Sequence, residues 1–217
     1  MYRARYRRDL DELNATMVEL MQSVSIAIEQ SVRALQERDV ELARAVIQGD
    51  QAVDDMNTRL ENKCMELLAL QQPMAKDLRM IVGILKIGID LERASDLAVD
   101  VARVAVQSKA VLPPAMTEDL KRMADIAQQM LKDVMRSLSE GNADIAREAT
   151  KWDYEMDRLY VKARDNLIKT AAENSDQAND LIPLMMANRH LERIGDHICN
   201  ICEHIIYMIE GKREHLN

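Results

Sequence analysis

The chain contains no Phe, one Trp and five Tyr among its 217 residues, and it has only six Gly and four Pro. β-Sheets favour aromatic and β-branched side chains and need turns rich in Gly and Pro, so an all-β fold is disfavoured. Straight-chain helix formers fill the sequence instead, and a hydrophobic content of 47% argues against disorder. We therefore predict an all-α protein.

Other scarcities narrow the class of protein further. A net charge of −8 argues against a general nucleic-acid binder. Apolar runs such as Ile81–Leu85 are far shorter than a membrane span, and the Arg-rich stretch at 1–10 is followed by no apolar run, so no secretory signal is predicted. Three cysteines do not make a disulfide framework. These features favour a cytoplasmic protein.

What the sequence does have is helical periodicity, which begins near Tyr6 and is interrupted only briefly. Apolar residues recur at spacings of three and four, as on the buried face of an amphipathic helix. Six helices are predicted, the second ending near Leu70, the third near Val106, and the fourth capped by Thr117. The breaks and caps between helices are expected at Asp39, Pro73, Pro113–Pro114, Gly141–Asn142 and Asn174–Asp176.

This pattern occurs twice in the chain. The motif Asp-x-x-x-Asp at 50–54 recurs at 153–157, an offset of 103, and Leu-Glu-Arg-x-x-Asp at 91–96 recurs at 191–196, an offset of 100. Each half holds three helices with short connections, so sequential helices are antiparallel neighbours. We predict two tandem, pseudo-symmetric three-helix bundles, residues 1–111 and 112–217, in an elongated molecule.

The duplicated motifs carry carboxylates on the polar side of their helices. At about 100° per residue, Glu92, Asp96 and Asp100 lie opposite the apolar stripe of the third helix. In a hairpin around Pro73, Asp54 and Glu92 stand level, each 19 residues from the turn. Asp50 and Asp96 likewise stand level at 23 residues, and the second half repeats this arrangement around 174–175 with Asp153, Asp157, Glu192 and Asp196.

Four carboxylates at one level repel each other and raise one another's pKa, and a bound cation would remove that cost. Oxygen ligands favour Mg²⁺, Mn²⁺, Ca²⁺ or iron. The alternative is a solvated acidic face with Lys86, Arg93 and Arg103 nearby. Under the metal hypothesis the ligands are Asp50, Asp54, Glu92, Asp96 and Asp100 in the first half, and Asp153, Asp157, Glu192, Asp196 and Asn200 in the second.

Other patterns point away from an enzyme. Ferritin-like metal sites need Glu-x-x-His, and no His in the chain has Glu three residues before it. Gly83 and Gly88 are spaced as in a phosphate-binding loop, but the Lys-Ser that such a loop requires after the second glycine is absent. Cys199-x-x-Cys202 lies in the middle of a predicted helix, where small packing residues are the better interpretation than a redox or zinc site. Cys64 is expected to be inert.

The segments Leu67–Arg79, Leu91–Asp96 and Leu191–His197 resemble the signatures of the PhoU family over nearly the whole chain. The resemblance implies two symmetric three-helix bundles in a cytoplasmic, homodimeric negative regulator of phosphate transport and homeostasis. It implies contact with the ATPase subunit PstB of the phosphate transporter and with the sensor kinase PhoR, membrane association through these partners only, and a signalling-off state when phosphate is plentiful.

The resemblance also implies metal ions (iron, manganese, magnesium or zinc) on the acidic helices, because family members carry metals, including iron clusters, there. By position this role passes to Glu92, Asp96 and Asp100, and to Glu192, Asp196 and Asn200. Asn200 stands where the first half has Asp100, and an uncharged amide is the weaker ligand. A metal-binding or metal-buffering helical protein without a signalling partner is the alternative function.

Overall fold

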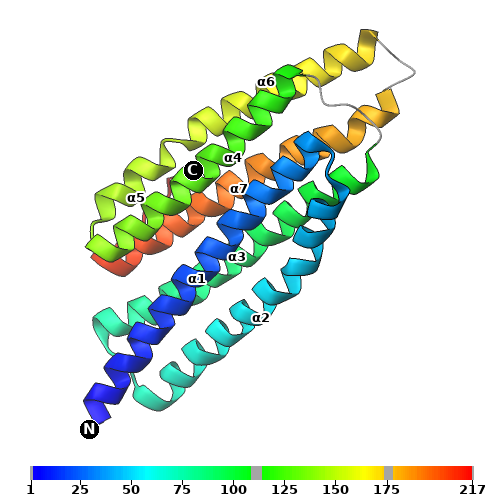
Figure 1. Ribbon diagram of the computed structural model, residues 1–217. Helices are drawn as coiled ribbons and strands as arrows, with labels where there is room; N and C mark the ends of the chain where they lie inside the picture. The colour runs from blue at the N-terminus through cyan, green and yellow to red at the C-terminus, as the bar shows by residue number, and fades with distance from the viewer. Residues whose placement is uncertain (1, 109–113, 174–177, 217) are drawn as a thin grey trace.

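The computed structural model describes residues 2–108, 114–173 and 178–216, and all regular secondary structure in these ranges is α-helical. None of its helices in these ranges combines the length and apolar character that a membrane crossing requires. Figure 1 shows an elongated molecule of long, nearly aligned helices, which confirms the predicted fold. The helices are α1 (Tyr2–Glu37), α2 (Val40–Gln71), α3 (Ala75–Gln107), α4 (Pro114–Glu140), α5 (Ala143–Thr150), α6 (Asp153–Glu173) and α7 (Ala178–Glu210).

The helices form two bundles that pack side by side. Helices α1, α2 and α3 pack on one another, and α7 is covered by α4, α5 and α6. The bundles meet where α3 packs along α7 and where α1 packs on α4 (Figure 1). Their buried apolar side chains form one continuous core. The two tandem bundles are therefore as predicted, while the predicted boundary at 111/112 lies outside the described residues.

Caps at the start of the second helix in each half confirm the duplication. The side chain of Asp39 accepts a hydrogen bond from the backbone N–H of Leu42 (2.9 Å), and that of Asn142 accepts one from Asp144 (3.0 Å). Each bond satisfies a backbone donor that the first helical turn leaves without a partner. The two capping residues are 103 apart, the offset already seen for the acidic motifs.

Other helix ends differ from the predictions in part. The turn at Pro73 is confirmed, since it lies between the end of α2 and the start of α3. Thr117 is not a cap, because α4 begins at Pro114, a residue that suits the first helical position. The predicted fifth helix is divided into α5 and α6 at Lys151–Trp152. The turn predicted at Asn174–Asp176 lies outside the described residues.

The predicted apolar stripes of α3 and α7 are buried, as Leu91 and Leu191 illustrate with exposed fractions of 0%. α3 also buries Asp90 and Ser95, because α2 and α7 cover two further sides of it. The three cysteines are buried among apolar neighbours, which agrees with a packing role. Burial raises the pKa of the Cys64 thiol to about 12, so this side chain is unreactive at neutral pH.

Candidate functional site

The first candidate site is an acidic face on the α2–α3 hairpin. Ser95 donates a hydrogen bond from Oγ to Asp50 Oδ1 at 3.1 Å, which fixes the register of the two helices. Burial raises the pKa of Asp50, the Ser95 hydrogen bond opposes this, and the charges of Asp54 and Asp96 raise it further. The hairpin therefore brings Asp50, Asp54 and Asp96 within electrostatic reach of one another.

Glu92 completes this first acidic face. Burial raises its pKa, Arg93 opposes the shift, and the charges of Asp96 and Asp54 add to it. Arg93 Nη1 lies 3.3 Å from Asp96 Oδ2 and neutralises part of the charge. The Asp96 side chain is 44% exposed, so the face is open to water. The four carboxylates that were predicted to stand at matching levels thus lie together on one side of the α2–α3 hairpin.

The second acidic face repeats this arrangement on α6 and α7 with deeper side chains. Burial, together with the charges of Asp157, Asp196 and Glu192, raises the pKa of Asp153 to about 6. The Glu192 side chain is only 15% exposed, and burial followed by the charge of Asp196 raises its pKa. Burial likewise raises the pKa of Asp196, with Asp157 adding to the effect. Ionisation of the carboxyl groups therefore costs more free energy on this face than on the first.

Two buried oxygens of the second face, Asp153 Oδ1 and Glu192 Oε2, have no hydrogen-bond partner among the described residues, although Arg189 Nη1 lies 3.5 Å from the Glu192 oxygen. Cys199 forms a hydrogen bond with the Asp153 carboxyl group, but Asp153 Oδ1 is buried without one. This oxygen points toward α7 at Gly195, where an added Cβ would lie 3.0 Å away. In the first bundle the equivalent residue is Ser95, and its hydroxyl satisfies Asp50. A buried carboxylate oxygen without a donor is a feature that a cation would stabilise.

The chemistry of these faces fits a hard cation, because every donor is a carboxylate oxygen and the charges repel one another. Within the described residues, however, no three His, Cys, Asp or Glu side chains already stand in an arrangement that could hold a metal ion. Binding would therefore require the carboxylates to rotate toward a common point. The metal sites remain a prediction.

Two predicted ligands have partners away from these carboxylates. Asp100 Oδ1 accepts a hydrogen bond from Arg103 Nη1 at 2.6 Å, within α3. Asn200 donates a hydrogen bond from Nδ2 to Asp90 Oδ1 at 3.1 Å, from α7 to α3. Asp100 lies close enough to His190 of α7 to oppose the lowering of the histidine pKa by burial. Both residues therefore belong to the seam between the bundles, which we define as the α3–α7 contact.

The seam contains a polar cluster that the sequence did not predict. Asp90 is 9% exposed, with His197 Nδ1 2.9 Å from Oδ1 and His204 Nε2 3.2 Å from Oδ2. Burial raises the pKa of Asp90, but hydrogen bonds from His197, His204 and Asn200 outweigh it and lower the pKa to about 2. We call these four residues the Asp90 cluster. It joins the two halves of the molecule through one buried carboxylate.

A sequence signal for this cluster does exist. His197, Asn200 and His204 are spaced by three and four residues, so they share one face of α7. The cluster also follows the duplication, because an offset of 100 turns the pair Asp90–Asn200 into His190–Asp100. In each pair, one residue lies on α3 and the other on α7, and the two face each other across the seam. The pseudo-symmetry axis therefore passes between α3 and α7.

These observations define an all-α protein of two duplicated bundles, each with an acidic face, joined along a partly polar seam. Comparison with known proteins identifies the group. The family model for the PhoU domain matches residues 17–105 and 120–205, one match in each bundle. The chain belongs to the PhoU family.

Relatives match over the full length of the chain. It is 34% identical over 218 residues to a phosphate-specific transport system accessory protein PhoU homolog of Clostridium acetobutylicum, covering 100% of both chains. It is 33% identical to PhoU homolog 1 of Methanothermobacter thermautotrophicus, covering 94% of each.

Two solved structures share the fold. The crystal structure of PhoU from Pseudomonas aeruginosa has a TM-score of 0.88 and 30% identity, with 95% of this chain and 100% of that one covered. The phosphate transport system regulatory protein PhoU from Streptococcus pneumoniae has a TM-score of 0.89 and 28% identity, with 97% and 100% covered.

Proposed function

We propose that the protein is a regulator of phosphate uptake and phosphate-starvation signalling that acts by contact with other proteins. The observation that carries this proposal is the match of both bundles, over the whole chain, to relatives named as phosphate-specific transport system accessory proteins. The partners we propose are a PstB-like transporter ATPase and a PhoR-like sensor kinase. The protein links the two and favours the signalling-off state when phosphate is plentiful.

The acidic faces give this regulator a second proposed property, the binding of metal ions. The first face offers Asp50, Asp54, Glu92 and Asp96, and the second offers Asp153, Asp157, Glu192 and Asp196. A bound iron, manganese, magnesium or zinc ion would supply positive charge there. The orphaned Asp153 Oδ1 and the mutual repulsion of the carboxylates support this part of the proposal. Asp100 and Asn200 would contribute only after leaving Arg103 and Asp90.

The setting follows from the proposed partners. Both act at the inner side of the cell membrane, so we place the protein in the cytoplasm, peripheral to the membrane through these partners. We also propose a homodimer. Partner contact rather than catalysis is the proposed mode of action.

A binding and signalling experiment tests the proposal. The full-length protein is presented to the purified transporter ATPase and to the cytoplasmic part of the sensor kinase, each with and without phosphate and Mn²⁺. We expect binding to at least one partner and constitutive phosphate-starvation signalling after gene deletion. Absence of both effects contradicts the proposal. High metal content without partner binding would favour a metal-buffering protein instead.

A further inference from the structure

One end of the first bundle is formed by the start of α1 and by the turn between α2 and α3 (Figure 1). Two contacts connect these segments. Lys63 Nζ of α2 lies 3.0 Å from Asp9 Oδ1 of α1, and burial together with the charge of Asp77 of α3 raises the pKa of Tyr6 of α1 to about 12. We call this end of the molecule, residues 5–8 and 70–79, the basic tip.

The basic tip has a charge opposite in sign to that of the whole chain, which is −8. Asp77 is its one acidic residue. Its five cations are Arg5, Arg7, Arg8, Lys76 and Arg79. The first four are exposed, and they form no ion pair in the part of the chain that the structure describes. A partner for this end is therefore expected to be anionic.

The helix itself does not favour cations at this place. The N-terminus of a helix carries partial positive charge, so basic side chains are unfavourable in its first turn, and the first turn of α1 contains no acidic residue. Side chains on a helix lean toward its N-terminus, so Arg5, Arg7 and Arg8 reach toward the end of the bundle. A negatively charged surface beyond the tip would turn this unfavourable arrangement into a favourable one.

The acidic residues nearest to the tip leave it positive. Lys63 neutralises part of their charge, because its ammonium group lies 3.0 Å from Asp9 and 3.8 Å from Glu66. Asp11 and Glu12 are exposed, but they follow the arginines along α1 and lie about one helical turn further from the end.

Large apolar side chains also protrude at the basic tip. Met74 is 81% exposed, Leu70 64% and Leu78 41%. They lie at the end of α2, in the turn and at the start of α3, so they belong to the same end of the molecule as the cations. Exposed apolar groups of this kind mark interaction sites. Together with neighbouring cations they are typical of surfaces that bind anionic bilayers.

We propose that the basic tip binds directly to the surface of a membrane that contains anionic phospholipids. Leu70 and Met74 enter the boundary between the head groups and the acyl chains, while the arginines of α1 pair with lipid phosphate groups. This contact adds to attachment through partner proteins and does not depend on it.

The first acidic face does not oppose this contact. Glu92 stands 19 residues after Pro73, which is roughly 28 Å along α3 at about 1.5 Å per residue. Charges separated by more than a Debye length, about 8 Å at physiological salt, are largely screened. A molecule that meets the membrane by its basic tip therefore keeps this face away from the negative lipid surface.

Flotation with protein-free vesicles tests the proposal. Vesicles of phosphatidylcholine alone are compared with vesicles of phosphatidylcholine and phosphatidylglycerol, at low and at high salt. We expect the full-length protein to float with the anionic vesicles at low salt, to be released at high salt, and to stay unbound with phosphatidylcholine alone. Absence of binding to the anionic vesicles overturns the proposal but leaves the proposed function standing, since no partner protein takes part.

A pair of charge variants locates the contact. Arg5→Gln/Arg8→Gln removes two cations of the tip, and Lys121→Gln/Lys132→Gln removes the same charge at exposed positions of the second bundle. Circular dichroism and melting temperature establish that both variants fold. We expect the tip variant to bind anionic vesicles about tenfold more weakly or worse, and the control to bind nearly as the unchanged protein does. Equal losses would show a response to net charge alone and would overturn the assignment to the tip.

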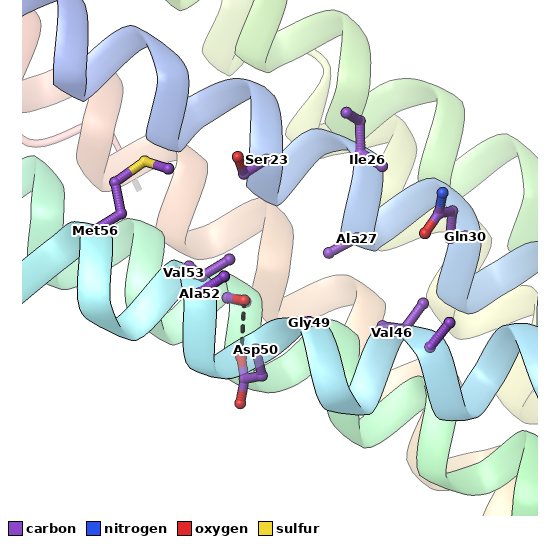
Figure 2. A pocket seen from close by; sticks show the side chains of 12 residues that line it. Ser23, Ile26, Ala27, Gln30, Val46, Gly49, Asp50, Ala52, Val53 and Met56 are labelled. Carbon is purple, nitrogen blue, oxygen red and sulfur yellow. Dashed lines mark hydrogen bonds between the residues drawn. The ribbon is translucent and has the colours of Figure 1, made fainter.

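A fluorophore at Met74 reports the apolar contact independently of charge. The three cysteines of the chain are buried, so Met74→Cys can be labelled selectively with a nitrobenzoxadiazole dye. Ile26→Cys is the control, because Ile26 is 52% exposed but lies in the middle of α1 beside the α1–α2 hollow shown in Figure 2. We expect anionic vesicles to shift the emission to the blue at Met74 only. No shift at Met74, or equal shifts at both positions, contradicts insertion of the tip.

An acidic protein partner is the other anionic surface that could meet the basic tip. Weaker binding of Arg5→Gln/Arg8→Gln to the transporter ATPase or the sensor kinase, with no vesicle binding by the unchanged protein, would assign the tip to that partner and overturn the membrane contact.

Discussion

Asp153 lies directly against Gly195, and the absence of a side chain at Gly195 allows this approach. A Cβ at that position would lie 3.0 Å from Asp153 Oδ1, an oxygen that accepts no hydrogen bond in the described part of the chain. The equivalent pair in the first bundle, Asp50 and Ser95, is hydrogen bonded at 3.1 Å. The protein therefore donates a side-chain hydrogen bond to Oδ1 of Asp50 in the first face, but donates none to Oδ1 of Asp153 in the second.

Gly195→Ser should make the second face resemble the first. The new hydroxyl would donate a hydrogen bond to Asp153 after the carboxylate shifts by a few tenths of an ångström. Because a hydrogen bond to the charged form favours ionisation, the pKa of Asp153 should fall from about 6 toward its ordinary range. Carboxyl ¹³C chemical shifts followed by NMR during a pH titration measure this change. A pKa that stays at or above 6 would show that the introduced hydroxyl does not act as the hydroxyl of Ser95 does.

The stability of the metal-free protein should fall as pH rises through the titration of Asp153. Its pKa rises from 3.8 to about 6 on folding, so the folded chain holds this proton more tightly. The resulting stabilisation is fully present below about pH 4 and is lost as pH rises past about 6. At about 1.4 kcal/mol per pKa unit this rise corresponds to roughly 3 kcal/mol, and solvent screening of the half-buried side chain reduces the expected loss to on the order of 2 kcal/mol.

Urea unfolding in EDTA between pH 4 and 7 measures this dependence. Asp153→Asn is the matched variant, because it keeps the size of the side chain and removes its titration. The difference in free energy of unfolding between the two proteins should grow in favour of Asp153→Asn as pH rises. A constant difference would contradict the assigned pKa. Asp90 titrates in a lower window, since its pKa falls from 3.8 to about 2, and its stabilisation is lost only as pH falls through about 2.

Removal of Asp90 should weaken the contact between the bundles. Asp90→Ala leaves His197, Asn200 and His204 without their common acceptor at a buried position. We expect the free energy of unfolding at pH 7 to fall by about 2 kcal/mol, the cost of buried polar groups without partners. Asp165→Ala is the control, because it breaks a solvent-exposed pair with Arg164 within α6 and should cost no more than about 0.5 kcal/mol. Equal effects in chemical denaturation would show that the Asp90 cluster adds no stability.

Removal of the face carboxylates should remove metal without unfolding the protein. Glu92→Ala/Asp96→Ala and Glu192→Ala/Asp196→Ala each disable one face, and Asp55→Asn removes an exposed carboxylate elsewhere on α2. After loading with Mn²⁺ or Fe²⁺, elemental analysis should show less metal in each double variant and no change in Asp55→Asn. Stability should change by at most about 0.5 kcal/mol for the first, open face. Wild-type metal content in both double variants would exclude these residues as ligands.

Much of the fold can be predicted because it depends on local and periodic signals. The caps at Asp39 and Asn142 and the turn at Pro73 follow from residue type alone. Matching the distances from Pro73 predicts that Asp50 stands level with Asp96, and the structure pairs Asp50 with the preceding residue, Ser95. The number of residues between each side chain and the turn thus determines which residues stand level in the hairpin, and that number can be counted in the sequence.

The seam cannot be predicted in the same way. The spacing of His197, Asn200 and His204 places them on one face of α7, but helical periodicity does not say which helix that face meets. The sequence pattern therefore does not single out Asp90, and it assigns Asn200 to a metal face. The interruption at Lys151–Trp152 also depends on tertiary packing, because Trp152 packs against the core beside α4. Rotation of side chains around their helices sets metal geometry, and the spacing of residues does not determine it.

Partner binding is the measurement that tests the proposed function most directly. The full-length protein is immobilised and titrated with the transporter ATPase and with the cytoplasmic part of the sensor kinase, with and without phosphate. We predict saturable binding to at least one of them. Failure to bind either protein, together with unchanged phosphate-starvation signalling in a deletion strain, would contradict the proposed function.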